Sequence, residues 1–77
     1  MKISYKKLWV LLIQKDIPKV TLRKESGIST STMSKLNKGE EVALSVLLRI
    51  CDYLDCDIGD ICEAVKIEIE VSKEHLK

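Results

Sequence analysis

The sequence contains no phenylalanine, one proline and three glycines, and it has no long hydrophobic run. So little proline and glycine excludes collagen-like and low-complexity chains. The longest apolar run has six residues, Leu8 to Ile13, whereas a transmembrane helix needs roughly 18 or more. This run is also shorter than the apolar part of a usual signal peptide, and no small cleavage-site residues follow it. We therefore expect a soluble protein of the cytoplasm that has no membrane partner.

The residues that are present suffice for one small folded domain and are too few for two. The chain has 77 residues, of which 45% are hydrophobic and 32% are charged. This composition excludes the disordered class, although a domain of this size buries only about 60% of its surface. The three cysteines form an odd set without regular spacing. They suit a reducing compartment better than a disulfide scaffold.

Charge is divided unevenly along the chain. Residues 1–40 contain nine Lys or Arg against three Asp or Glu, whereas residues 41–77 contain four against nine. The first half therefore has a net charge of +6 and the second half of −5, although the whole chain has only +1. A basic half indicates a polyanion partner, because neutralising phosphates releases counterions. A merely solvated surface of uneven charge is the alternative.

Apolar residues at helical spacing and capping residues locate the helices. The pattern predicts five short helices, near residues 5–15, 18–25, 30–37, 44–54 and 58–64. Ser4, Ser29 and Asp57 are good caps because a side-chain oxygen can accept an orphan backbone N–H. Pro18 suits the first helical position, where its missing N–H costs nothing. The short connections between these helices predict a compact all-helical bundle.

Residues 65–71 alternate between β-branched apolar and charged side chains, which predicts a strand. A single strand needs a mate, either the same strand in a second subunit or residues near Ile3. We expect a homodimer in which the apolar face of this strand lies over the first helix, since the run 8–13 is apolar on nearly all sides. Residues 1–64 would then form the domain, and residues 72–77 a solvated tail.

Two of the predicted helices are joined by a sharp turn, Ser26 to Ser29. Gly27 supplies the left-handed conformation in which a helix can end, and Ser29 starts the next helix. This arrangement is a helix-turn-helix. In its second helix Met33 and Leu36 face inward with Ile28. Polar side chains remain on the outside: Thr30, Ser31, Thr32, Ser34, Lys35 and Lys38.

The outward face suits DNA, because short hydroxyls near a helix start can reach base edges and lysines can meet phosphates. An ordinary polar helix in a bundle is the alternative. The combination with the turn and with the basic first half favours DNA binding over a merely polar surface.

The same residues resemble the Cro and phage-repressor (XRE-like) type of helix-turn-helix regulator. The resemblance covers about residues 3–64, and its motifs are Leu22-Arg23-Lys24-Glu25-Ser26-Gly27-Ile28-Ser29, Thr32-Met33-Ser34-Lys35-Leu36, Lys38-Gly39-Glu40 and Leu47-Leu48-Arg49-Ile50-Cys51. The segments ISYKKLWVLLI and CDYLDCDIGDI are similar to small single-domain bacterial regulators of the YozG or VanU kind. The resemblance implies an all-α, five-helix lambda-repressor-like domain, here followed by a short C-terminal β-strand.

The resemblance also implies a DNA-binding site on and beside the second helix of the motif. Its expected residues are Lys19, Ser29, Thr30, Ser31, Thr32, Lys35, Asn37 and Lys38. Lys19 falls at a phosphate-contacting position, Thr30 and Ser31 fall at the main base-reading positions, and the last three residues fall at the end of the recognition helix. The chain departs from the family at Arg23, where alanine is frequent, and at Pro18, which replaces a hydroxyl cap.

Other chemistry has little support in the sequence. Cys51, Cys56 and Cys62 with His75 would suffice for zinc by count, but they lack tight CxxC pairs. Ordinary packing is favoured over redox sensing, with Cys56 the most exposed thiol expected. No catalytic arrangement, glycine-rich phosphate loop or cofactor site is recognisable, so we expect neither an enzyme nor a metalloprotein. Trp9 is expected to pack rather than to stack on bases.

We therefore expect a dimeric transcriptional regulator that binds double-stranded DNA and acts by operator occupancy, with no small-molecule substrate. The alternative from another class is a protein–protein interaction module on a helix-turn-helix scaffold. Such a module would bind another regulator through its acidic half or through residues 65–71. Retention on heparin or random DNA at low salt distinguishes the two.

Overall fold

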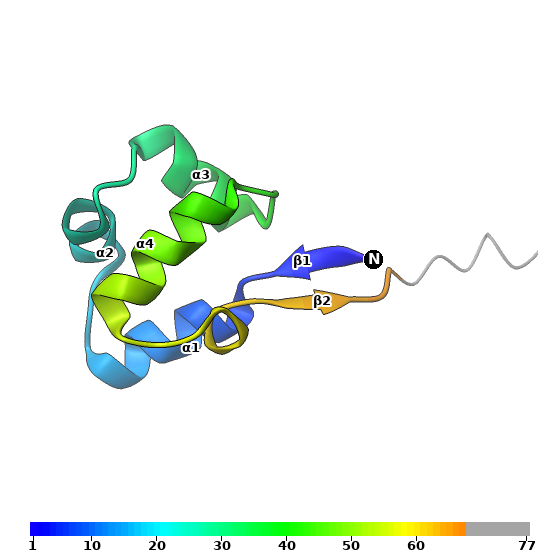
Figure 1. The fold of residues 1–77 in the computed structure, drawn as a ribbon, viewed down its shortest axis with the longest axis horizontal. Coiled ribbons are helices and arrows are strands. Elements are labelled where there is room, and N and C mark those ends of the chain that lie inside the picture. The colour runs from blue at the N-terminus through cyan, green and yellow to red at the C-terminus, as the bar shows by residue number, and fades with distance from the viewer. Residues whose placement is uncertain (68–77) are drawn as a thin grey trace, which may run out of the picture.

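A computed structural model describes residues 1–67 of the chain. Its elements in chain order are β1 (Lys2–Ser4), α1 (Lys6–Lys15), α2 (Lys19–Ser26), α3 (Thr30–Lys38), α4 (Leu44–Leu54), the single 3-10 turn η1 (Ile58–Asp60) and β2 (Glu63–Val65). The four α-helices gather into one helical part, from which the two strands extend side by side (Figure 1). The mostly helical architecture expected from the sequence is confirmed.

The core lies between the helices and receives a side chain from each of them. Its most deeply buried large residues are Leu8, Leu22, Leu36, Ile50 and Ile61. The first four belong to α1, α2, α3 and α4 in turn, and the fifth directly follows η1. Each helix is too short to be stable in isolation, so this shared burial of apolar surface stabilises them together.

All four helices end at a residue with positive φ. These residues are Asp16 (59°), Gly27 (70°), Gly39 (76°) and Asp55 (55°). The left-handed conformation lets the backbone N–H groups that follow a helix return to its last carbonyls, and the chain then turns sharply. The connections stay short as a result, and α2 packs against α4.

The expected fifth helix over residues 58–64 is wrong. Asp57 caps it as predicted, with Asp60 accepting a hydrogen bond from the Asp57 backbone N–H, but the helix stops after the turn η1. The next residues pair with the start of the chain instead, so that Ile3 lies opposite Ala64 in the antiparallel pair β1–β2. Backbone groups of residues 63–65 are satisfied by this pairing and not by helical hydrogen bonds.

The predicted strand 65–71 therefore overlaps the observed strand only at Val65. Of the two mates considered, the structure shows the residues near Ile3. Residues 68–71 of the prediction, and the tail at 72–77, lie outside the described residues. Pro18 is also displaced from its predicted place: it precedes α2 in an extended conformation and is not the first helical residue.

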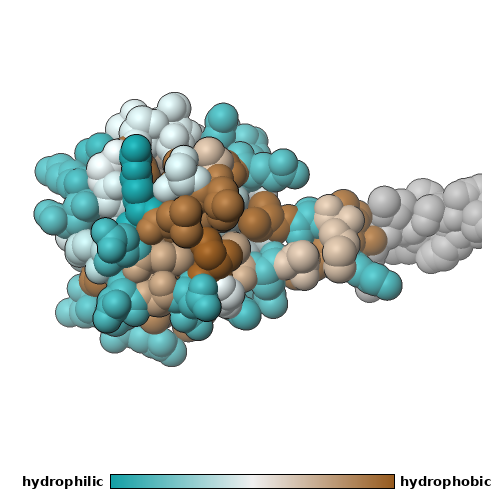
Figure 2. Space-filling model, in the orientation of Figure 1, coloured by the Kyte–Doolittle hydropathy of each residue, from teal (hydrophilic) through white to brown (hydrophobic). Residues whose placement is uncertain are grey.

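The second side of α1 is not covered by the described strand. Val10 is 47% exposed and Ile13 is 79% exposed. Exposed hydrophobic side chains also include Leu44 and Leu48, four residues apart on α4. Figure 2 shows hydrophobic side chains gathered over α4 on the face turned to the viewer. No helix within residues 1–67 is both long and apolar enough to cross a membrane.

Candidate nucleic-acid interface

The helix-turn-helix has the inward and outward faces that the sequence predicts. Ile28, Met33 and Leu36 are buried and join the core. Gly27 ends α2 with a φ of 70°, and its carbonyl accepts a hydrogen bond from Arg49 Nη1 of α4 at 3.3 Å. The turn is thus held from the core side, and α3 presents its opposite face to solvent.

A network of hydroxyl groups closes the start of α3. Ser29 Oγ accepts a hydrogen bond from the Thr32 backbone N–H at 3.1 Å and lies 3.0 Å from Thr32 Oγ1. Ser31 Oγ lies 3.1 Å from the same serine oxygen. Ser29 is the capping residue that the sequence predicts. Thr32 is only partly exposed, whereas Thr30 and Ser31 are exposed at the end of the helix.

Lys19 and Asn37 lie together although 18 residues separate them. Lys19 is the first residue of α2, and its Nζ donates a 2.8 Å hydrogen bond to Asn37 Oδ1 on the last turn of α3. The same ammonium lies 4.1 Å from the centre of the Trp9 ring on α1. A cation over an aromatic face at this distance is held by the negative ring face. Three helices therefore meet at one ammonium group.

Trp9 is a residue that the sequence reasoning treated as packing alone. It packs against the core, as predicted, and it also holds Lys19. The remaining expected residues of the last turn, Lys35 and Lys38, are exposed and follow the favourable placement of cations near a helix C-terminus. The eight expected site residues thus form two groups: the hydroxyl network at the start of α3, and the donors around Asn37 at its end.

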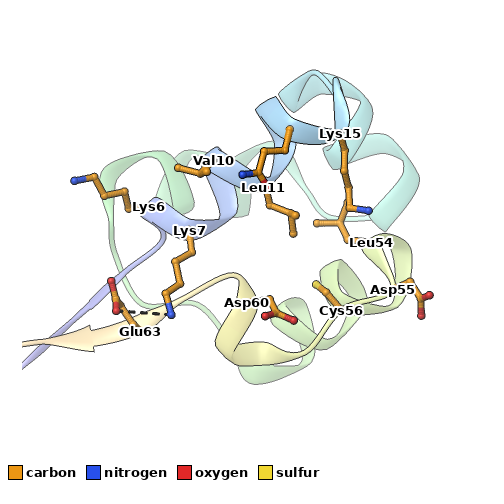
Figure 3. A pocket seen from close by; sticks show the side chains of 11 residues that line it. Lys6, Lys7, Val10, Leu11, Lys15, Leu54, Asp55, Cys56, Asp60 and Glu63 are labelled. Atoms are coloured by element: carbon orange, nitrogen blue, oxygen red, sulfur yellow. Dashed lines mark ion pairs between the residues drawn. The ribbon is translucent and has the colours of Figure 1, made fainter.

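Two hollows flank α1. One has a volume of about 350 Å³ and lies between β1, the start of α1 and the end of α3. The other has a volume of about 560 Å³ and lies between α1, the end of α4 and η1 (Figure 3). Lys7 crosses toward this second hollow, where its Nζ lies 3.8 Å from Glu63 Oε1 and donates to the Gly59 carbonyl at 3.1 Å. Lysines and carboxylates alternate around it, so its charges oppose one another.

The three cysteines are held as packing residues. Cys51 and Cys62 are buried and Cys56 is partly buried, and none of the three is in a disulfide. Burial raises the pKa of the Cys51 thiol to about 11, and burial likewise raises the pKa of Cys56 and of Cys62. These thiols are therefore protonated at neutral pH, and a thiolate is the form that reacts or binds metal. Residues 1–67 contain no group of three or more His, Cys, Asp or Glu placed to hold a metal ion.

A helix-turn-helix whose second helix presents a polar and basic face defines a class of DNA-binding domain. A model of the Cro/C1-type HTH DNA-binding domain matches residues 7–66 of the chain. The crystal structure of transcriptional regulator VanUg, Form II, is similar to it, with 55% sequence identity and a TM-score of 0.84, over 86% of this chain and 88% of that chain. No curated protein sequence is significantly similar.

The chain belongs to the Cro/C1-type helix-turn-helix DNA-binding family. The resemblance to Cro-type regulators noted in the sequence is confirmed. The comparisons also support the coarser statement of function, that the chain is a DNA-binding regulator.

Proposed function

We propose that the chain is a sequence-specific transcriptional regulator that acts by occupying an operator, with α3 as its recognition helix. The observation that supports this most directly is the outward face of α3, where exposed hydroxyls stand at one end and exposed amines at the other. An α-helix fits the major groove, where each base pair presents a distinct pattern of donors and acceptors.

We assign different tasks to the two groups of site residues. Thr30 and Ser31 would read base edges, because they are exposed at the end of α3 that enters the groove in this family of motifs. Ser29 and Thr32 would hold the start of the helix, because their hydroxyls lie within hydrogen-bonding distance of each other. This assignment supports a readout by few residues.

The end of α3 would bind phosphate. Asn37 Oδ1 already accepts from Lys19, so the amide of Asn37 and the other N–H groups of Lys19 are left to donate. Donors without acceptors match phosphate oxygens and not the mixed edge of a base. Lys35 and Lys38 would add point charges beside them.

We further propose that the chain binds as a homodimer in the cytoplasm. Short hydroxyls make few bidentate contacts, so a single α3 would discriminate weakly and two copies would double the readout. Residues 65–71 are the proposed dimerisation segment, because a two-stranded ribbon such as β1–β2 is marginal without further pairing. Sedimentation of a chain ending at Val65 tests this segment: we expect a monomer, and an unchanged dimer would remove the role of the strand.

Selection of bound duplexes from a random pool tests the function itself. We expect enrichment of a pseudo-palindrome whose half-sites lie about one helical turn apart. Binding to the selected duplex should weaken steeply with salt, since phosphate contacts release counterions. Failure to retain any duplex at low salt would overturn the proposal and favour the protein–protein interaction module instead.

A further inference from the structure

We propose that the hollow between β1, the start of α1 and the end of α3 is a second binding site for the DNA backbone, with Lys2 and Lys6 as its cations. This inference rests on the proposed function and extends the contact surface beyond the helix-turn-helix. We call the hollow the N-terminal groove. The residues that line it are Lys2, Ile3, Ser4, Tyr5, Lys6, Trp9, Leu36, Asn37, Lys38 and Gly39.

The charge of the N-terminal groove has one sign. Three of its lining residues are lysines, contributed by β1, α1 and α3, and none of the described residues that line it is acidic. The hollow on the other side of α1 is different, because Asp55, Asp60 and Glu63 face its lysines. Lys6 borders both hollows, and Figure 3 shows it pointing away from Glu63 whereas Lys7 points toward it. An anion is thus favoured in the first hollow and opposed in the second.

The wall of the groove is fixed before any ligand arrives. Tyr5 is buried and its Oη donates a 2.8 Å hydrogen bond to the Glu40 carbonyl, which ties the chain after α3 to the start of α1. On the other wall Trp9 holds Lys19, and Lys19 holds Asn37. Preorganised donors bind an anion without the cost of ordering them.

The position of the groove fits the path of a DNA strand. The nine residues of α3 make a helix about 13 Å long, close to the width of about 12 Å of the major groove. The C-terminal end of α3 therefore lies near one of the two strands that border the groove of the duplex. Asn37 and Lys38 stand at that end and also line the N-terminal groove, so a strand that contacts them passes directly beside Lys2 and Lys6.

The dimensions and the floor of the groove fit a sugar-phosphate unit. Its volume of about 350 Å³ is at the lower end of the range of ligand clefts, roughly 300–1,000 Å³. Ile3 and Leu36 give it apolar surface for a deoxyribose, and Ser4 and Asn37 add polar groups beside the lysines. Glu41 borders a separate hollow together with Lys2, so we expect Lys6 to contribute more than Lys2.

The test compares two double variants that each remove two positive charges. Lys2→Gln with Lys6→Gln empties the groove of two cations, and Lys7→Gln with Lys15→Gln is the matched control on the face of α1 that borders the other hollow. Binding of the full chain to one selected duplex is followed by fluorescence anisotropy over a series of salt concentrations. Urea unfolding shows that both variants are folded.

We expect the groove variant to reduce the slope of log affinity against log salt by about 0.9 for each phosphate that is no longer neutralised, and to weaken binding about 10- to 100-fold near 0.1 M salt. The control should keep the wild-type slope. Equal slopes for the two variants would overturn the inference while leaving the proposed function intact. Absence of DNA binding by the wild-type chain would overturn the proposed function first, so the two failures are distinguishable.

Discussion

The ammonium of Lys19 lies over the ring of Trp9, 4.1 Å from its centre, and from there donates a hydrogen bond to Asn37 Oδ1. Trp9 belongs to α1, which is not part of the helix-turn-helix, yet it sets the direction in which the first residue of α2 points. A residue at the back of the motif therefore positions a donor at its DNA-facing edge.

Trp9→Leu should weaken DNA binding about two- to fivefold, the range expected when an exposed cation–π interaction is removed. Trp9→Phe keeps an aromatic face and should weaken binding less. Anisotropy titrations of both variants with one duplex measure the difference. Equal weakening by leucine and phenylalanine would show that bulk and not the ring face positions Lys19. The intrinsic fluorescence of Trp9, the chain's single tryptophan, should change when DNA binds the wild-type chain.

Thr30→Ala and Lys38→Ala should differ in kind. Thr30→Ala should change the order of preference among related duplexes, because it removes a group that reads base edges. Lys38→Ala should weaken all duplexes similarly and lower the salt slope by about 0.9, because it removes a phosphate contact. A panel of single-base variants of the selected duplex measures both effects. Uniform weakening of the whole panel by Thr30→Ala would exclude it as a reader.

Ser29→Ala should reduce the free energy of unfolding by about 1 kcal/mol, because the Thr32 backbone N–H loses its acceptor. Ser29→Asp supplies another acceptor and should restore most of the stability. Ser34→Ala is the control, since Ser34 is exposed in the same helix and has no capping role. Urea unfolding monitored by circular dichroism measures all three, and a destabilisation by Ser34→Ala as large as that by Ser29→Ala would contradict the capping role.

Stability should decrease at alkaline pH because of the cysteines. Burial raises the pKa of Cys51 from 9.0 to about 11, so the folded chain retains a thiol proton that the unfolded chain releases. This contribution is fully present below pH 9 and is lost as the pH rises toward 11. The urea midpoint should therefore fall over this interval, and it should fall less in Cys51→Ala. Identical pH profiles for the two chains would assign the effect to other groups.

The features that depend on neighbouring residues are predictable from the sequence. The turn at Gly27, the cap at Ser29 and the inward face of Met33 and Leu36 each follow from residue type and helical spacing, and the structure confirms all of them. The core stripe of α4 is likewise visible in the sequence as Leu47, Ile50, Cys51 and Leu54.

The features that the sequence did not predict depend on distant residues. The helix after Asp57 stops at Asp60 because residues 63–65 pair with β1, and nothing near Glu63 announces a partner some sixty residues earlier. The expectation of a strand was correct in kind but began two residues too late. The contact of Lys19 with Trp9 depends on how α1 packs beside α2, which spacing along the chain does not reveal.

The hydroxyl network at the start of α3 restricts how the specificity of this regulator can diverge. A substitution at Ser29 or Thr32 that suited a new operator would also remove an internal bond of the helix, so it would be selected against for reasons unrelated to DNA. Exposed Thr30, Ser34 and Lys35 have no such double duty in the described contacts. Evolution toward new operators, and engineering with the same aim, should therefore begin at these three positions.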